Sequence, residues 1–578
     1  MGKIFKYFRL HEWILFFMMF LSVVGQVACT LTLPDYMSKI IGHITSGTKN
    51  LSKVWQSGGI IVLIAAINAV FATVSNLFSA KLSADFTAHL REIVFKKVES
   101  FSMAEINHFS TASLITRSTN DIQQIANMFS MGFKFLLMCP LMAIYAIIKI
   151  IGKSTQLSLY TAGGIILLSI FFVFVFLLVI PKFKIMQNLV DNVNGVMREN
   201  LTGLRVIRAY NAESYQEEKF EKTNAKLTKV MITANSIMVF TDPLIQFIMN
   251  ALNLGVMWIG AYLINDGNLS LQVMTSFSMY AMHVIMSFMF LTMVSIMLPR
   301  ALISVKRVSE ILESKNLILD PENETPITKK GCVEFRNVNF KFHDSSQNVL
   351  TNINFTANQG ETVAIVGGTG SGKSALINLI PRFYDVTSGE VLVNGTNVKE
   401  YKQANLRDKI GYVSQKAILF SGSIKSNITF GSQNISDEQI VRASQIAQAS
   451  EFINERDDGY DSAIAQGGSN VSGGQKQRIS IARAIAKNPE IYIFDDSFSA
   501  LDYKTDKTLR TELKKHIRNA TCIIVAQRIG TIIDADKIIV LDDGKIVGYG
   551  KHKDLLCNCD VYKQIAYSQL SKEELENA

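Results

Sequence analysis

A glycine-rich run gives the sequence its clearest chemical signal. It follows a short apolar segment, Val363–Val366, and precedes a segment with helical spacing, Ala375–Ile380. The run consists of Gly367, Gly368, Thr369, Gly370, Ser371, Gly372, Lys373 and Ser374. Glycines at this spacing let backbone N–H groups turn toward phosphate oxygens, and the N-terminus of the following helix adds its positive pole. The pattern therefore predicts a Walker A phosphate-binding loop between a buried strand and a helix.

Two side chains of this loop and one later carboxylate predict that the ligand is ATP with Mg²⁺. Lys373 should neutralise the β- and γ-phosphate oxygens, while the hydroxyl of Ser374 should bind the metal ion. A second apolar run, Ile491–Phe494, ends in Asp495, the Walker B carboxylate, which should reach Mg²⁺ directly or through water. A chance match to the Walker A pattern is the alternative, and the order of strand, loop and helix argues against it.

A third motif lies between the two Walker sequences. It opens a helical segment that carries Gln477, Arg478 and Arg483. Its residues are Val471, Ser472, Gly473, Gly474 and Gln475. Taken alone, it could be an ordinary serine N-cap followed by a glycine-rich turn. In this position, however, the Ser-Gly-Gly-Gln sequence resembles the signature motif of ATP-binding cassette (ABC) proteins, which other P-loop ATPases lack.

The resemblance to ABC proteins extends to further short motifs. Gln415 is similar to the Q-loop glutamine, which in this family contributes to Mg²⁺ binding and senses the membrane domain. Phe342 is similar to the aromatic residue that stacks on adenine, with Phe in place of the usual Tyr. The D-loop that crosses between two cassettes is matched by Ser499, Ala500, Leu501 and Asp502. The resemblance implies that two cassettes pair head to tail, with each ATP between the Walker motifs of one and the signature of the other.

Two residues depart from the family pattern at the reaction centre. Asp496 stands where the family has a glutamate that polarises the attacking water, and Gln527 stands where it has a histidine near the γ-phosphate. Asp lacks one methylene, which should withdraw the carboxylate by roughly 1 Å, a displacement that can cost about 10²-fold in rate. An amide can donate a hydrogen bond but cannot become a cation. With Gln415, these residues form the predicted catalytic set, and we expect this chain's own site to bind ATP but to hydrolyse it poorly.

The signature motif, in contrast, is intact. It would complete the second composite site, whose Walker motifs come from the partner. A homodimer would carry two impaired sites, whereas a heterodimer with a chain that has both Glu and His would carry one competent and one degenerate site. The sequence therefore favours a heterodimer with a second half-transporter, as in the family's asymmetric multidrug exporters, and a homodimer is the alternative.

Composition divides the chain into two halves. Apolar runs rich in Met and Phe dominate residues 1–312, and charged, Gly-punctuated segments dominate residues 331–578, with a linker at 313–330. A bilayer core needs about 20 apolar residues per helix. The six runs of about this length lie near Trp13–Leu33, Gly59–Leu77, Phe133–Ile151, Leu157–Ile180, Ile237–Leu263 and Leu271–Leu298. The predicted fold class is an α-helical membrane domain with long cytoplasmic extensions, followed by an α/β P-loop nucleotide-binding domain.

The distribution of Lys and Arg predicts the orientation of these helices. Basic residues concentrate before the first span and in the long connections that follow the second and fourth spans. By the positive-inside rule, both termini and both long connections are cytoplasmic. The net charge of +9 thus has a membrane explanation, and we predict no nucleic-acid partner. Within the long connections, Glu105–Ser113 and Arg208–Glu213 resemble the short coupling helices that dock on cassettes.

A cleavable signal peptide is the alternative for the first span, because a basic start precedes an apolar run that ends in Ala28 and Cys29. Gln26 does not fit a lipoprotein-type cleavage pattern, and further spans follow, so both features argue against a signal peptide. The six cysteines are scattered without metal-ligand spacing, and Cys557 and Cys559 alone cannot make a zinc site. Only the Mg²⁺ of the nucleotide site is predicted as a metal.

The sixth span carries methionines in steps of three and four residues. They are Met279, Met282, Met286, Met289 and Met293. This spacing places them on one face of a helix. Two interpretations stay open. The face could pack against neighbouring helices, where Met fills irregular gaps, or it could form a soft cavity wall that adapts to varied apolar substrates.

The sequence predicts one half of an ATP-driven exporter of small hydrophobic or amphipathic compounds. Such a chain would be a multi-pass protein of a bacterial cell membrane and would contact membrane lipids. A lipid or peptide exporter is one alternative. A regulatory membrane subunit that binds ATP without pumping is another.

Overall fold

The computed structural model describes residues 2–45, 51–151, 153–325, 329–343, 345–432 and 434–570. The chain forms two compact units. The first comprises Met1–Lys97 and Ala112–Ser314, and the second comprises Val98–Thr111 and Lys315–Ala578. A short segment from the membrane half, Val98–Thr111, thus belongs to the second unit. Residues 326–328 of the predicted linker lie outside the described part of the chain.

The first unit contains, in its described part, six helical runs that are long and apolar enough to cross a membrane, which confirms the six predicted spans. They are α2 (Leu10–Thr45), α3 (Leu51–Glu99), the run Thr111–Ile151, α8 (Thr155–Ala209), α9 (Glu213–Asn265) and α10 (Leu271–Glu313). The third run combines α5 (Thr111–Thr116), η1 (Arg117–Asp121), α6 (Ile122–Asn127), η2 (Met128–Gly132) and α7 (Phe133–Ile151), and the short α1 (Gly2–Phe5) precedes α2. Helices α3, α8 and α9 extend well beyond their apolar spans, as expected.

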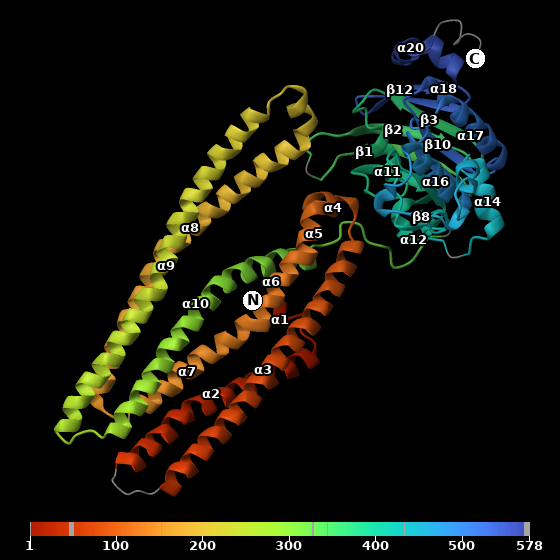
Figure 1. The fold of residues 1–578 in the computed structure, drawn as a ribbon. Helices are drawn as coiled ribbons and strands as arrows, with labels where there is room; N and C mark the ends of the chain where they lie inside the picture. The colour runs from red at the N-terminus through yellow and green to blue at the C-terminus, as the bar shows by residue number, and fades with distance from the viewer. Residues whose placement is uncertain are drawn as a thin grey trace. The chain divides into compact units, whose positions relative to one another are not determined.

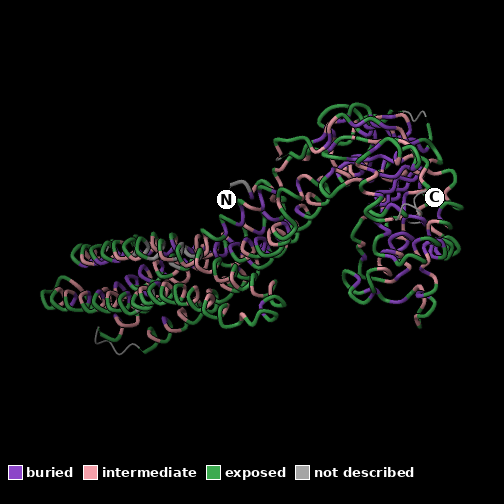
Figure 2. Tube along the Cα trace, turned by 90° about the horizontal axis from the view of Figure 1, so that it is seen from above, coloured by how far each residue is buried: buried purple, intermediate pink, exposed green. Residues whose placement is uncertain are grey.

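Helices of the first unit pack around a shared apolar core. Helices α2, α7 and α10 contribute most of its residues, such as Val27, Met142 and Tyr280, and α8 and α9, which run side by side (Figure 1), add Leu157 and Val256. Glycine permits a close approach in this pair, because a Cβ at Gly164 of α8 would lie 2.0 Å from the Cδ2 of Leu252 in α9. The outer faces of these helices are largely exposed (Figure 2), including many large apolar side chains, which suits contact with lipid tails.

An ionic cluster joins α2, α7 and α10. Asp35 of α2 accepts hydrogen bonds from Lys149 at 2.7 Å and from Lys153 at 3.1 Å. Lys153 also donates to Ser276 of α10 at 2.9 Å, and its ammonium lies 4.8 Å from the ring centroid of Tyr280. One carboxylate is therefore shared by two ammonium groups at this end of the helices.

A second polar cluster lies near the C-terminal end of α10. The buried Asp121 of η1 accepts a hydrogen bond from Ser304 at 2.9 Å and forms an ion pair with Arg307 at 3.3 Å. Arg117 of η1 donates to the carbonyl of Arg307 and to the carboxylate of Glu310, both at 2.8 Å. The π-helical turn η1 is thus fastened to α10 by charged side chains from both elements.

The second unit contains a six-stranded sheet with the order β12-β11-β3-β10-β9-β6 and a four-stranded sheet with the order β2-β1-β4-β5. The larger sheet consists of β3 (Thr362–Gly367), β6 (Ile410–Val413), β9 (Ile491–Asp495), β10 (Thr521–Val525), β11 (Lys537–Asp542) and β12 (Lys545–Gly550). The smaller sheet consists of β1 (Val333–Phe340), β2 (Leu350–Ala357), β4 (Ser388–Val393) and β5 (Thr396–Asn397), and β7 (Gly422–Ser423) pairs with β8 (Ala463–Ile464).

Helices and two apolar cores surround the larger sheet. The helices are α11 (Lys373–Leu379), α12 (Gln403–Asp408), α13 (Ile424–Ile428), α14 (Asp437–Ile446), α15 (Ser450–Asn454), α16 (Gly473–Ala486), α17 (Tyr503–His516), α18 (Ile529–Ile532), α19 (His552–Asn558) and α20 (Asp560–Tyr567). Side chains of β3 alternate between the cores, with Val363 and Ile365 in one and Ala364 and Val366 in the other. Burial on both faces explains the continuous apolar runs of these strands.

The strand order brings the predicted motifs to one edge of this sheet. Strands β3, β10, β9 and β6 are parallel neighbours. The chain leaves their carboxyl ends at the Walker A loop, Gln527, Asp495 and Gln415, respectively. Carboxyl ends of parallel strands share one edge, where α/β proteins bind their ligands. Motifs far apart in the sequence therefore converge there.

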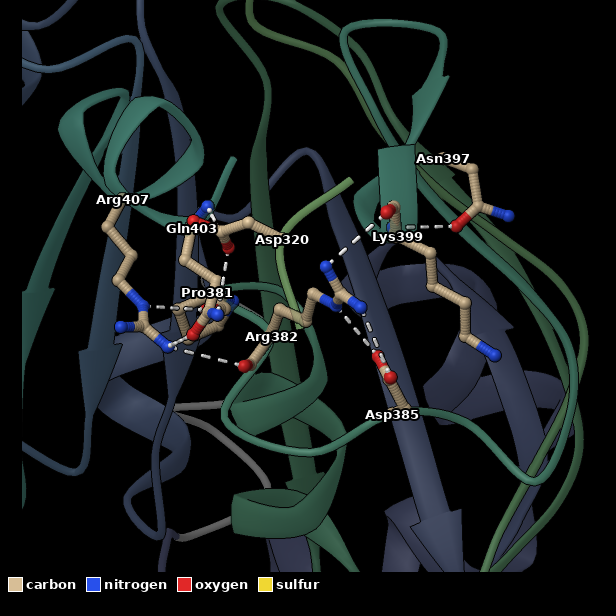
Figure 3. Close-up of polar contacts among 8 residues, drawn as sticks. All are labelled: Asp320, Pro381, Arg382, Asp385, Asn397, Lys399, Gln403 and Arg407. Carbon is tan, nitrogen blue, oxygen red and sulfur yellow. Dashed lines mark hydrogen bonds and ion pairs between the residues drawn. The ribbon is translucent and has the colours of Figure 1, made fainter. Parts of the chain in front are cut away.

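Hydrogen bonds fix the loop after α11 and tie the segment after α10 to the cassette (Figure 3). The buried guanidinium of Arg382 donates to Asp385 at 2.9 Å and to the carbonyl of Lys399 at 3.3 Å. Arg407 donates to Gln403 at 2.9 Å, and the amide of Gln403 donates to Asp320 at 2.9 Å. The segment that follows the membrane domain is therefore anchored on α12.

Candidate nucleotide site

The Walker A loop has the strand–loop–helix form that the sequence predicts. Gly370 and Gly372 adopt left-handed backbone angles, with φ of 84° and 97°. A Cβ placed at Gly368 or Gly370 would meet no heavy atom within 4 Å, so the loop has open space where these Cβ atoms would lie. The ammonium of Lys373, the first residue of α11, donates to the carbonyls of Gly367 at 2.9 Å and Gly368 at 2.6 Å.

Charge is concentrated around Lys373. Burial lowers the pKa of Lys373, while the negative charges of Asp496 and Asp495 act in the opposite direction. Both aspartate residues are only 8% exposed. One ammonium and two carboxylates therefore lie together at the open loop, in a region of low dielectric where charges interact strongly.

Asp495 and Ser374 lie next to each other. The hydroxyls of Ser374 and Tyr412 both act to lower the pKa of the Asp495 carboxyl, and the Tyr412 hydroxyl donates to the Oδ1 atom of Asn378 at 3.1 Å. Burial raises the pKa of Asp495, and the charge of Asp496 raises it further. Two buried carboxylates and a hydroxyl, with the single ammonium of Lys373 beside them, offer hard oxygen donors with an excess of negative charge, which fits Mg²⁺. Tyr412 was not predicted as a site residue, and its position in β6 carries no motif that would reveal it.

The three predicted catalytic residues form one hydrogen-bonded cluster. The Oδ2 atom of Asp496 accepts a bond from the amide of Gln415 at 3.2 Å and another from the amide of Gln527 at 3.0 Å. The backbone of Asp496 has a φ of 46°, and its N–H donates to the carbonyl of Val525 at 2.9 Å. Two amides and a constrained backbone thus hold this carboxylate in place.

The signature motif begins α16. Ser472 is the N-cap of this helix and forms a reciprocal capping box with Gln475, with bonds of 3.3 and 3.0 Å. The serine N-cap that the sequence allows is therefore present. Its hydrogen bonds join Ser472 and Gln475 and do not involve Gly473 or Gly474. A Cβ at Gly473 would meet nothing within 4 Å, and one at Gly474 would come no closer than 3.5 Å to the carbonyl of Ala500 in the D-loop.

Helix α16 also contacts the Q-loop and α13. Gln477, which is buried, donates to the carbonyl of Ser414 at 3.3 Å, directly beside Gln415. Arg483 donates to the backbone carbonyl of Asn427 at 2.8 Å. The sequence singled out Gln477 and Arg483 only as parts of the helix, because a contact between distant segments leaves no local pattern.

The D-loop is fixed at both ends. The hydroxyl of Ser499 donates to the carbonyl of Asp496 at 2.8 Å, and Leu501 is buried. Asp502 accepts a bond from the N–H of Thr505 at 3.0 Å and thereby caps α17. Hydrogen bonds therefore tie the loop to the end of the Walker B strand and to the start of α17.

Phe342 lies just after β1 and presents a partly exposed ring. Its centroid lies 5.0 Å from that of Phe340 and 5.4 Å from that of Tyr384. The hydroxyl of Tyr384 accepts a hydrogen bond from Asn107 at 3.1 Å. Asn107 belongs to α4 (Met103–Phe109), which overlaps the first predicted coupling helix, Glu105–Ser113. A chain of side chains thus connects α4 to the aromatic residue predicted for adenine.

The second predicted coupling helix differs in form. Helix α8 continues to Ala209 and α9 begins at Glu213, so only residues 210–212 form a tight turn between two long helices. Asn211 has a φ of 50°, a conformation that Asn tolerates better than most residues. The left-handed residue ends the helix before a separate one can form.

The methionines of the sixth span share one exposed face. Met279, Met282, Met286, Met289 and Met293 are between 37% and 45% exposed. The opposite face of α10 is buried, with Phe277, Tyr280 and Val284 in the core. The core of this unit therefore does not account for the methionine spacing.

Comparison with known proteins agrees with these features. The family described as the ABC transporter transmembrane region matches residues 15–288, and the family described as ABC transporter matches residues 350–499. An uncharacterised ABC transporter ATP-binding protein of Mycobacterium tuberculosis is 34% identical over 558 residues, which cover 96% of this chain and 95% of the relative. The solved structure of a bacterial Atm1-family ABC exporter with ATP bound has a TM-score of 0.80 and 25% identity, and covers 95% of this chain and 96% of its own.

Two further relatives have names that refer to transport. An ATP-dependent lipid A-core flippase of Syntrophus aciditrophicus is 30% identical over 526 residues, with 89% of this chain and 86% of the relative covered. A putative multidrug export ATP-binding/permease protein of Bacillus subtilis is 28% identical over 550 residues, with 94% of each chain covered.

The membrane helices, the P-loop cassette and its signature define an ABC transporter, and the chain belongs to that family. It is a half-transporter of the exporter type, a multi-pass membrane protein in which one membrane domain precedes one ATP-binding domain. Its enzymatic class is that of the transport ATPases.

Proposed function

We propose that the chain is one subunit of a heterodimeric multidrug-type exporter that moves hydrophobic or amphipathic compounds. The names of two relatives support this substrate class, since one is a putative multidrug export protein and the other a lipid A-core flippase. Lipid export is the second candidate because of the flippase relative. The exposed methionine face of α10 is the proposed substrate surface, since flexible thioethers adapt to varied apolar shapes.

The observation that carries the proposal is the environment of Asp496. Its carboxylate is shorter than the family's glutamate, and one of its oxygens already accepts bonds from Gln415 and Gln527. Gln527 can donate a hydrogen bond but cannot supply a positive charge at the γ-phosphate. This chain's own site therefore binds ATP and holds it, with little hydrolysis.

Mg²⁺ would be held in this site by Ser374, Asp495 and Gln415. When bound, the ion neutralises charge on the phosphate oxygens. Lys373 binds the phosphates next to it, and Phe342 stacks on adenine. Burial of Asp495 strengthens its interaction with a cation, because water competes less for the carboxylate.

The signature of this chain acts on the partner's ATP. Val471, Gly473 and Gly474 lie at the start of α16, where the helix N-terminus favours the γ-phosphate of a nucleotide bound to the partner. The partner is then a second half-transporter with Glu after its Walker B Asp and a switch His, so that each complex has one hydrolytic site. A homodimer would have none that is intact.

The orientation follows from the charge distribution. Both termini and the cassette face the cytoplasm of a bacterial cell, and transport is directed outward. ATP brings the two cassettes together and opens the membrane domains to the outside, and hydrolysis at the partner's site resets them.

The test is to purify the tagged full-length chain from membranes and identify the half-transporter that copurifies. The pair is then reconstituted in liposomes with a fluorescent hydrophobic dye or a fluorescent phospholipid. We expect ATP-driven movement of the dye, and its loss with the partner's Walker A lysine replaced. Movement of the phospholipid alone supports the lipid exporter. A pair that binds ATP and moves neither probe is a regulatory complex and contradicts the proposal.

A further inference from the structure

Gln569, which follows α20, binds the backbone of the segment that carries Gln527. Its Nε2 donates to the carbonyl oxygen of Gln527 at 2.8 Å, and its Oε1 accepts from the N–H of Ile529 at 2.8 Å. Ile529 begins α18, and the N-cap residue Arg528 supplies no side-chain acceptor. Gln569 therefore satisfies one of the unpaired N–H groups at this helix start, and holds the chain on both sides of Arg528.

The position of Gln569 is itself fixed by the fold. Tyr562 and Ala566 of α20 are fully buried in the same apolar core as β10. Backbone bonds from Gln569 and Leu570 to the carbonyl of Ala566, at 3.1 and 3.0 Å, continue the last turn. Leu570 packs against this core as well. The side chain of Gln569 thus projects from an anchored turn.

The contacts lead from Gln569 to the nucleotide site through one residue. Gln569 holds the backbone of Gln527, and the side chain of Gln527 donates to Asp496 at 3.0 Å. We propose that Gln569 is a positioning residue that sets where Gln527 presents its amide, and thereby how well the site distinguishes ATP from ADP. This inference rests on the proposed placement of Gln527 at the γ-phosphate.

The test compares Mg·ATP and Mg·ADP affinities of the purified full-length chain in lipid nanodiscs. Gln569→Met removes the donor and the acceptor at similar side-chain length, and we expect the preference for ATP over ADP to fall about fivefold, as for loss of one typical hydrogen bond. Gln569→Glu keeps the acceptor for Ile529 but loses the donor, so its preference should lie between those of wild type and Gln569→Met. The matched control is Gln564→Met, on an exposed position of α20.

A double-mutant cycle separates positioning from a general structural role. In a Gln527→Ala background, Gln569→Met should cause no further loss of ATP preference, because the side chain that it positions is gone. Equal losses of ATP and ADP affinity, an unchanged preference, or additive effects would each overturn the inference. If Gln527→Ala alone leaves the preference intact, the placement of Gln527 at the γ-phosphate fails and the inference fails with it.

Hydrogen exchange tests the contact without nucleotide. Backbone amides of residues 527–531 should exchange faster in Gln569→Met than in wild type or Gln564→Met. Unchanged protection would show that Gln569 does not hold this segment, and would overturn the inference by itself.

Discussion

The same physical forces stabilise the cassette and the membrane unit, but the role of a residue is easier to recognise from the sequence in the cassette. In the cassette, site residues are glycines, short polar side chains and carboxylates at or just after the ends of buried strands, such as Gly367 and Asp495. In the membrane unit, core and surface are both apolar, as Val284 and the exposed Leu291 of one helix illustrate. Residue type therefore identifies a role in the cassette, whereas in the membrane unit only packing does.

The strongest test of this contrast is a pair of adjacent glycines. A Cβ at Gly367 would lie 2.1 Å from the backbone oxygen of Leu541 in β11, so Gly367→Ala should destabilise the cassette by about 3 kcal/mol through forced strand separation. Gly368→Ala meets no atom within 4 Å and should fold normally, but its methyl group would occupy the phosphate loop and weaken ATP binding. Thermal unfolding with and without Mg·ATP measures both. Similar unfolding temperatures for the two variants would contradict the assigned roles.

The next largest effect on stability is expected when a charged side chain of the membrane unit is removed. Asp35→Ala leaves Lys149 and Lys153 without their shared carboxylate, and because Asp35 is only partly exposed we expect a loss of about 2 kcal/mol. Glu218→Ala removes a well-exposed partner of Lys222 and should change stability by no more than about 0.5 kcal/mol. Thermal unfolding of the full-length chain in detergent compares them. Equal, small effects would mean that the cluster does not join the helices.

A smaller effect is expected at the Walker B carboxylate. The pKa of Asp495 is raised by burial and by Asp496, so the folded state binds a proton more tightly than the unfolded state does. Ionisation of Asp495 therefore destabilises the fold at neutral pH, and Asp495→Asn should raise the unfolding temperature measured without nucleotide. The same variant should lose the stabilisation by Mg·ATP.

The raised pKa of Asp495 also predicts how ATP binding depends on pH. Protonation would remove a ligand of the proposed Mg²⁺ site, so in wild type the Mg²⁺-dependent part of ATP binding should weaken on acidification at a higher pH than an ordinary Asp would give. Asp495→Asn should show no such dependence. A wild-type profile that is flat down to the ordinary Asp range would contradict the raised pKa.

The methionine face of α10 should give the smallest change in stability. Replacing Met282, Met286 and Met289 with Val should leave the unfolding temperature nearly unchanged, because these side chains are exposed in the chain. Stiff β-branched side chains cannot adapt to different shapes, so the ranking of compounds that stimulate ATPase activity should change. The control variants are Met138→Val and Met142→Val, on the buried face of α7. They should destabilise the membrane unit without altering the ranking of compounds. The reverse pattern would assign the exposed face to packing.

Much of the nucleotide site could be predicted because its spacing is local. Walker A, Walker B and the signature each occupy one short segment, and parallel strands carry them to one edge of the sheet. Tyr412 and Gln569 could not be predicted, because their roles depend on contacts between segments far apart in the sequence.

In the membrane half, the spans could be read from hydropathy but not their internal geometry. The third run contains the π-helical turns η1 and η2, which hydropathy alone does not locate. The turn at Asn211 likewise depends on a single left-handed residue within a charged stretch. The predicted separate coupling helix at residues 208–213 is instead the junction of α8 and α9, with a turn at residues 210–212.

The division of labour between two nucleotide sites is tested most directly by steady-state ATPase activity of the assembled pair. Replacing the proposed partner's glutamate after Walker B with Gln should lower turnover by about 10²-fold, because it would remove the general base of the proposed hydrolytic site. Asp496→Asn, at the site where Gln415 and Gln527 already hold the carboxylate, should lower it by less than about threefold. Comparable losses from both substitutions would contradict the asymmetry.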